Sequence, residues 1–206
     1  GASGSEKKDQ PAGRKCPVAA VDLVSLREQY PDVQGWLTIP DTGIDYPVLQ
    51  SEQENGEFYL KRNYKKEYDI NGSLFLQADC KVSESRNLII YGHNINGRRY
   101  FGYLQNFREE TFFKEYPVFS FTPIEGKEQD YHIVSILETD KYADYYSFTD
   151  YGNEKDYYGM VEKILSHSKF QSEAAKKMKK EMDERDAEAF FRKYKFVTLS
   201  TCRTMD

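Results

Sequence analysis

The chain has little of the material from which several classes of protein are built. It contains no apolar run near the roughly 18 residues of a membrane-spanning helix, and no secretory signal sequence. Its three cysteines are too few and too unevenly spaced for a disulfide framework, and an odd number leaves at least one thiol unpaired. Basic residues form no patch, because 29 Lys and Arg are interspersed with 34 Asp and Glu. The net charge of −5 therefore argues against nucleic acid as a partner.

Aromatic residues are the most prominent feature that is present. They make up 15% of the chain, with 17 Tyr and one Trp, which is typical of a sheet-rich domain. The length of 206 residues fits one domain with a sizeable core. Residues 1–17 are polar and without periodicity, so we expect a flexible leader, and its GASGS start resembles a cloning scar. Residues 18–206 are expected to form a single domain.

The hydrophobic pattern predicts a mostly β fold with few helices. A helix is expected from residue 18 to Tyr30, because Pro31 follows. Two strands should flank the PDTG turn at residues 40–43. Further strand candidates are SLFLQ, NLIIYG, VFSFT, YHIVSIL and FVTLST, which favour a mostly antiparallel sheet or barrel.

A long helical insertion is expected before the last strand. Its first half should pack on the sheet through an apolar face, and its second half should be a charged helix with a narrow apolar stripe. The first face consists of Tyr157, Val161, Ile164 and Leu165, and the stripe of Ala175, Met178 and Met182.

Cys202 ends the last alternating strand, where functional groups are often found. An unpaired cysteine can also be a small buried hydrophobe, so a chemical role requires a partner. His93 is the best candidate, because it follows the buried strand at 88–90 and Gly92 permits a sharp exit. If the two strands run side by side in the same direction, thiol and imidazole meet at one edge. An imidazolium lowers the thiol pKa from about 8.5 and can protonate a leaving amine.

Other chemistries remain open. Cys80, Cys202 and His93 are nominal zinc ligands, but they show no CxxC or HxxxH spacing. No two carboxylates stand out as a glycosidase pair. No calcium-loop pattern occurs, and no metal or cofactor is expected. His132 lies within a strand and His167 on the insertion helix, where structural roles are expected.

The sequence resembles the class B sortases, cysteine transpeptidases of Gram-positive bacterial surfaces. The matching segments are TLSTC at 198–202, YGHN at 91–94 and GWLTIPDTGIDYPVLQ after an N-terminal helix, and the resemblance runs from about residue 20 to the end. It implies an eight-stranded β-barrel with an N-terminal helix and a helical insertion before the Cys-bearing strand. The last strand of that barrel is expected to be missing from this chain.

The resemblance also implies roles for individual residues. Cys202 would be the nucleophile and His93 the general acid and base. The family's oxyanion arginine is expected beyond Asp206, and Arg203 would be a substitute from a different position. The expected substrate-binding residues are Tyr91, Asn94, Ser200 and Thr201 in a groove, with Tyr145 and Tyr146 as its wall.

In such an enzyme the thiolate attacks the Thr carbonyl of a sorting signal of the LPxTG or NPxTN kind. An amine of a peptidoglycan peptide or a pilin lysine then resolves the thioester. The resemblance implies attachment to the outer face of the cell membrane by an N-terminal anchor not included in this sequence. Two alternatives remain: a thiol hydrolase that transfers the acyl group to water, and a non-catalytic surface domain with the same fold.

Overall fold

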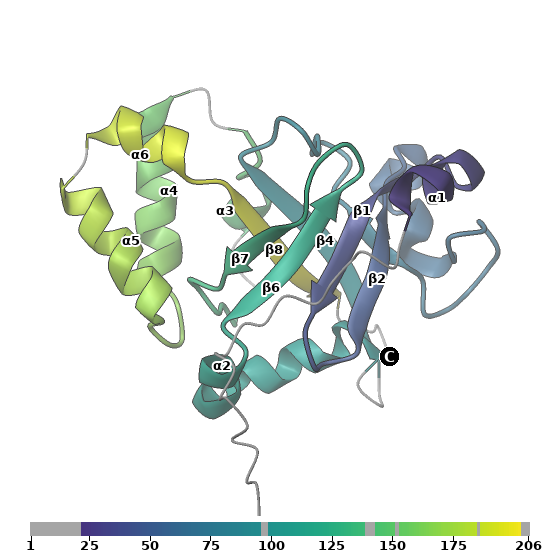
Figure 1. Cartoon of the computed structure of the whole chain (residues 1–206), viewed down its shortest axis with the longest axis horizontal. Helices are drawn as coiled ribbons and strands as arrows, with labels where there is room; N and C mark the ends of the chain where they lie inside the picture. The colour runs from purple at the N-terminus through teal and green to yellow at the C-terminus, as the bar shows by residue number, and fades with distance from the viewer. Residues whose placement is uncertain (1–21, 96–98, 139–142, 151–152, 185, 203–206) are drawn as a thin grey trace, which may run out of the picture.

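A computed structural model describes residues 22–95, 99–138, 143–150, 153–184 and 186–202 (Figure 1). Within them, eight strands form one sheet that does not close on itself. The expected mostly β fold is confirmed, although the strands form an open sheet rather than a closed barrel over the described residues. The predicted leader at 1–17 lies outside the described part of the chain.

The sheet combines antiparallel and parallel pairs. Its order is β5-β4-β3-β2-β1-β6-β7, and β8 pairs with β4. The β2/β3 and β4/β8 pairs are parallel, and the other pairs are antiparallel. The strands are β1 (Val33–Ile39), β2 (Ile44–Leu49), β3 (Leu74–Leu76), β4 (Asn87–Ile95), β5 (Arg99–Tyr100), β6 (Val118–Pro123), β7 (Gln129–His132) and β8 (Phe196–Cys202).

The hairpin of β1 and β2 forms where the PDTG turn predicted it. Asp41 and Gly43 have positive φ angles of 62° and 77°, a conformation that glycine adopts without steric cost. Thr42 closes the turn, because its hydroxyl donates to the carbonyl oxygen of Ile39 at 2.7 Å. The turn therefore fixes the β1/β2 register.

The first helix, α1 (Leu23–Gln29), has Tyr30 as its C-cap, so the predicted end before Pro31 is confirmed. Its start differs from the prediction, because Asp22 is extended and the helix begins at Leu23. Asp22 caps its N-terminus by accepting a hydrogen bond from the Ser25 amide. None of the described helices is long and apolar enough to span a membrane. The remaining helices are η2 (Gln53–Gly56), η3 (Phe58–Lys61), η4 (Phe101–Arg108), α2 (Glu110–Glu115), α3 (Ala143–Tyr146), α4 (Glu154–Ser166), α5 (Glu173–Glu184) and α6 (Ala187–Lys193).

The helical insertion packs mainly on itself. Helices α4, α5 and α6 lie together on one side of the sheet (Figure 1), and their apolar cluster includes Phe196 at the start of β8. The predicted second helix is two helices, since Asp186 caps α6 by accepting from the Ala189 amide at 2.8 Å. The predicted stripe of Ala175, Met178 and Met182 is buried, as are Tyr157 and Val161, whereas Ile164 and Leu165 are half-buried.

The strand predicted from YHIVSIL is wrong in its extent, since β7 ends at His132. The Ile133 amide still donates to the Pro117 carbonyl beside β6, but residues 133–138 form no ladder among the described residues, and the next backbone groups bond to the connection between α4 and α5. Ser172 donates to the Ile133 carbonyl at 2.7 Å, and the Ile136 amide donates to the Ser168 hydroxyl at 2.9 Å. The insertion therefore covers the end of this strand.

Candidate active site

His93 and Cys202 occupy opposite positions in the ladder of β4 and β8. These strands are parallel and in register from Asn87 opposite Phe196 to His93 opposite Cys202. Figure 1 shows β8 beside β4 in the middle of the molecule. Neighbouring strands lie about 4.8 Å apart, so the backbones of the two predicted residues are adjacent. The backbone therefore meets the condition for the thiol–imidazole pair, because the two strands run side by side in the same direction.

The reason for Gly92 differs from the prediction. Strand β4 continues through Gly92 to Ile95, so His93 lies inside the strand and not past its end. A Cβ atom at Gly92 would lie 2.5 Å from Leu74 Cδ2 and 2.6 Å from Phe101 Cδ2. Glycine is needed here because two core side chains pack against the backbone.

The His93 ring is half-buried and bonded to a backbone group that the sequence did not suggest. Its Nε2 lies 2.6 Å from the carbonyl oxygen of Leu60, in η3. A carbonyl oxygen only accepts hydrogen bonds, so Nε2 is the donor. The segment FYLK carries no motif, and only the folded structure reveals this contact.

Three of the predicted substrate-binding residues lie together. The rings of Tyr91 and Tyr146 stack with centroids 6.0 Å apart, and the Tyr146 and Ser200 hydroxyls are 3.0 Å apart. Gln77, which the sequence did not single out, completes the group: it accepts from the Tyr91 hydroxyl at 2.5 Å and donates to the Tyr146 carbonyl at 2.8 Å. Helix α3 is thus fixed over the ends of β4 and β8. Gln77 directly follows β3, whose Phe75 pairs with Tyr91 in β4. A prediction of this strand pairing would have placed Gln77 near Tyr91.

Asn94 and Thr201 are separated from this group by strand alternation. Successive side chains point to opposite faces of a sheet, so Asn94 falls on the face opposite His93. Thr201 is the register partner of Gly92 and is exposed. Their assignment to the same groove stays a prediction that the structure does not favour.

Tyr145 differs from Tyr146. Its side chain is only 7% exposed, and its hydroxyl lies 2.8 Å from Nδ1 of His167 at the end of α4. The contact with His167 accounts for the burial of Tyr145. A direct contact between Tyr145 and the substrate stays a prediction. Arg203 and Asp206 lie outside the described residues.

Cys80 lies away from the candidate site. Cys80 is 2% exposed, and burial raises its pKa to about 11. Its Sγ lies 3.6 Å from the Asn87 carbonyl oxygen, at the opposite end of β4 from His93. The zinc-ligand combination is therefore not assembled, and in the residues that the structure describes no three His, Cys, Asp or Glu side chains cluster. Cys80 has the character of a core residue.

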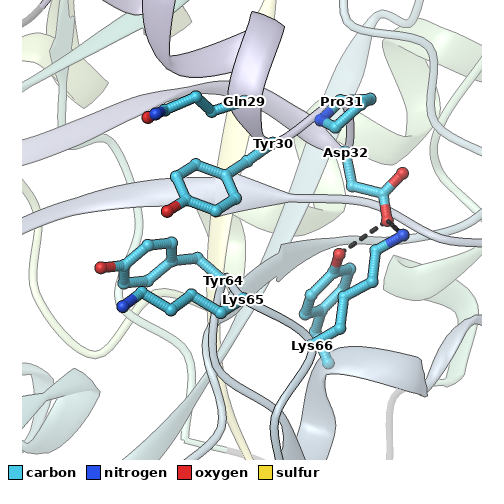
Figure 2. A pocket seen from close by; sticks show the side chains of 8 residues that line it. Gln29, Tyr30, Pro31, Asp32, Tyr64, Lys65 and Lys66 are labelled. Atoms are coloured by element: carbon cyan, nitrogen blue, oxygen red, sulfur yellow. Dashed lines mark hydrogen bonds and ion pairs between the residues drawn. The ribbon is translucent and has the colours of Figure 1, made fainter.

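A hollow of about 270 Å³ lies between the end of α1 and residues 64–66 (Figure 2). The Tyr30 and Tyr64 rings meet edge to face, with centroids 4.8 Å apart. Asp32 accepts a hydrogen bond from the Tyr59 hydroxyl at 2.6 Å, and Lys66 Nζ lies 3.8 Å from the same carboxylate oxygen. The polar groups that line the hollow thus bond mainly to one another.

Comparison with known proteins identifies the fold as that of a sortase. No family model matches the sequence. Sortase B of Listeria monocytogenes is 31% identical over 185 residues, covering 89% of this chain and 68% of that protein. The solved structure of sortase B from that organism is 30% identical, with a TM-score of 0.70 over 88% of this chain and 94% of that one. A sortase B structure from B. anthracis, in complex with AAEK1, is 28% identical, with a TM-score of 0.72 over 86% and 76% of the two chains. The chain belongs to the sortase B family of cysteine transpeptidases.

Proposed function

We propose that this chain is a transpeptidase that uses Cys202 as nucleophile and His93 as general acid and base. The observation that supports this most is the register of β4 and β8, which sets the two residues opposite each other in adjacent parallel strands. A thiol near an imidazolium ionises more readily, and the thiolate is the reactive form.

In the first half of the proposed reaction, the Cys202 thiolate attacks the carbonyl carbon of the scissile peptide bond. The carbon–nitrogen bond breaks, and the leaving amine takes a proton from His93. A thioester remains on the cysteine. In the second half an incoming amine loses its proton to His93, attacks the thioester and releases the thiolate. Over both halves one amide bond of the protein substrate is broken and one is formed, so no redox partner is needed.

We propose that the substrate is a C-terminal sorting signal of the LPxTG or NPxTN kind. The group formed by Tyr91, Tyr146 and Ser200 supports a peptide-binding surface, because it presents stacked rings and hydroxyls beside His93. The proposed acceptor is an amine of peptidoglycan or of a pilin lysine. The proposed location is the outer face of the cell membrane, through an anchor preceding this sequence.

The oxyanion of the tetrahedral intermediate requires a donor. An arginine beyond Asp206 remains our expectation for this role, with Arg203 as a substitute. Removing one such donor typically costs about 10²–10³ in rate, so a protein extended beyond Asp206 should be compared with this chain in every activity assay.

Hydrolysis by the same thiol is the main alternative. The test is incubation with LPxTG-like and NPxTN-like peptides, with and without an added amine, followed by mass spectrometry of the products. Transpeptidation predicts an amide product that grows with amine concentration and is lost in Cys202→Ala and His93→Ala. A free acid product at all amine concentrations would indicate a hydrolase, and unchanged turnover in both variants would contradict the assignment of the residues.

A further inference from the structure

The hydrogen bond between His93 and Leu60 assigns the protons of the imidazole. The Nε2 atom lies 2.6 Å from the carbonyl oxygen, which has no proton to donate, so Nε2 carries one. A neutral imidazole has a single N–H group, so its lone pair is then on Nδ1. Only in the charged form do both nitrogens carry protons.

The Leu60 carbonyl is held by a well-bonded segment. Leu60 donates its own amide to the Glu57 carbonyl at 3.0 Å. On either side of Leu60, the Tyr59 carbonyl accepts from the Ser73 amide and the Lys61 carbonyl accepts from the Asp69 amide, each at 3.0 Å. These bonds fix the direction of the peptide groups in η3, and so the direction in which the Leu60 oxygen points.

Gly72 allows this arrangement. Its φ of +63° lies in the left-handed region that side chains rarely adopt. A Cβ atom at this position would overlap the carbonyl oxygens of both Leu60 and Tyr59. Any larger residue must therefore move η3 and the oxygen that contacts His93.

Tyr59 ties the same segment to β1. Its ring is 1% exposed, and its hydroxyl donates to the Asp32 carboxylate at 2.6 Å, at the hollow shown in Figure 2. Burial, with a further contribution from Asp32, raises the Tyr59 pKa above its usual value, so the hydroxyl stays protonated and keeps donating. Asp32 itself directly precedes β1.

We infer that the Leu60 carbonyl is the positioning group of His93, holding it with the proton on Nε2 and leaving Nδ1 to exchange protons during catalysis. Tyr59, Asp32 and Gly72 support that carbonyl without touching the reacting atoms. The catalytic half of this inference rests on the proposed function, whereas the orientation of the ring does not.

The direct test is nitrogen and proton NMR of the unmodified protein labelled with ¹⁵N-histidine. The His93 signals are assigned by their loss in His93→Gln. We expect an Nε2–H proton that is shifted downfield and exchanges slowly with water, because it is hydrogen-bonded and half-buried. Exposed His132 should give no such signal, and His167 provides a ring whose contact is through Nδ1. A His93 ring whose only proton is on Nδ1, or one with no slowly exchanging Nε2 proton, would overturn the inference.

Two variants test the supporting residues. Tyr59→Phe keeps the ring and removes the bond to Asp32; we expect faster exchange of the Nε2 proton and about a fivefold fall in kcat with little change in KM. Tyr158→Phe is the control, since it removes one hydroxyl bond, to the Met182 carbonyl, in the remote insertion. Gly72→Ala should alter the ring signals more strongly. A Tyr59→Phe protein with wild-type exchange and kcat would contradict the role of Tyr59.

The inference and the proposed function fail separately. A slowly exchanging Nε2–H signal in a protein that forms no thioester would leave the orientation correct and the transpeptidase proposal wrong. Full activity without that signal would leave the transpeptidase proposal standing and refute the positioning role of Leu60.

Discussion

His93 and Cys202 are register partners in adjacent parallel strands, although more than a hundred residues separate them in the chain. The whole helical insertion lies between them, and it packs chiefly around its own apolar cluster and Phe196. The pair therefore depends on the β4/β8 ladder, and changes that disturb this ladder should affect the site before they affect the insertion.

Gly92→Ala is expected to lower the free energy of unfolding by about 1–3 kcal/mol. Its Cβ atom would overlap Leu74 and Phe101 in the core, and the strain falls next to His93. Gly159→Ala is the matched control, because nothing lies within 4 Å of its Cβ atom and α4 should gain about 0.5–1 kcal/mol from the better helix former. Urea unfolding of both variants measures the difference. Equal stability of the two would show that β4 does not pack as described.

Tyr146→Phe is expected to raise KM for a sorting-signal peptide about fivefold, the effect of one lost hydrogen bond of about 1 kcal/mol. The change removes the hydroxyl contact with Ser200 and leaves the stacking on Tyr91 intact. Steady-state kinetics give the measurement, and Tyr158→Phe serves again as the control. Loss of the hydroxyl with no change in KM would exclude this part of α3 from substrate binding.

Most of the scaffold could be predicted from the sequence, because local signals determine it. The turn at Asp41 and Gly43 and the apolar stripe of α5 follow directly from residue type and spacing. The adjacency of His93 and Cys202 requires that their two strands be parallel neighbours in the sheet. Hydrophobic periodicity alone does not predict the order of strands. The resemblance to a known family implied roles for the two residues, and the ladder of β4 and β8 shows that their strands are adjacent.

The features that the sequence missed depend on contacts between distant segments. The Leu60 carbonyl is a backbone group, so no residue type reveals its bond to His93. The position of Gln77 depends on the pairing of β3 with β4. The end of β7 at His132 follows from Ser168 and Ser172 in the insertion, which compete for the backbone of the next residues.

The Cys80 thiol should make stability depend on pH in the alkaline range. Its pKa is about 11 in the folded protein, above the value near 8.5 expected when unfolded. The folded state thus keeps a proton that the unfolded state loses, and the stabilisation, of the order of 3 kcal/mol, is present below pH 8.5 and falls as pH rises towards 11. Urea unfolding at pH 7 to 11 should show a smaller decline in Cys80→Ala than in the wild type. Parallel declines would mean that the thiol is not buried.

The most direct measurement is the mass of the protein after brief incubation with a sorting-signal peptide, followed by acid quenching and mapping of the modified residue. The account predicts a thioester of the cleaved acyl fragment on Cys202. It should be absent in Cys202→Ala and strongly reduced in His93→Ala, and Cys80 should remain unmodified. An acyl group on another residue, or a thioester that forms equally well without His93, would contradict it.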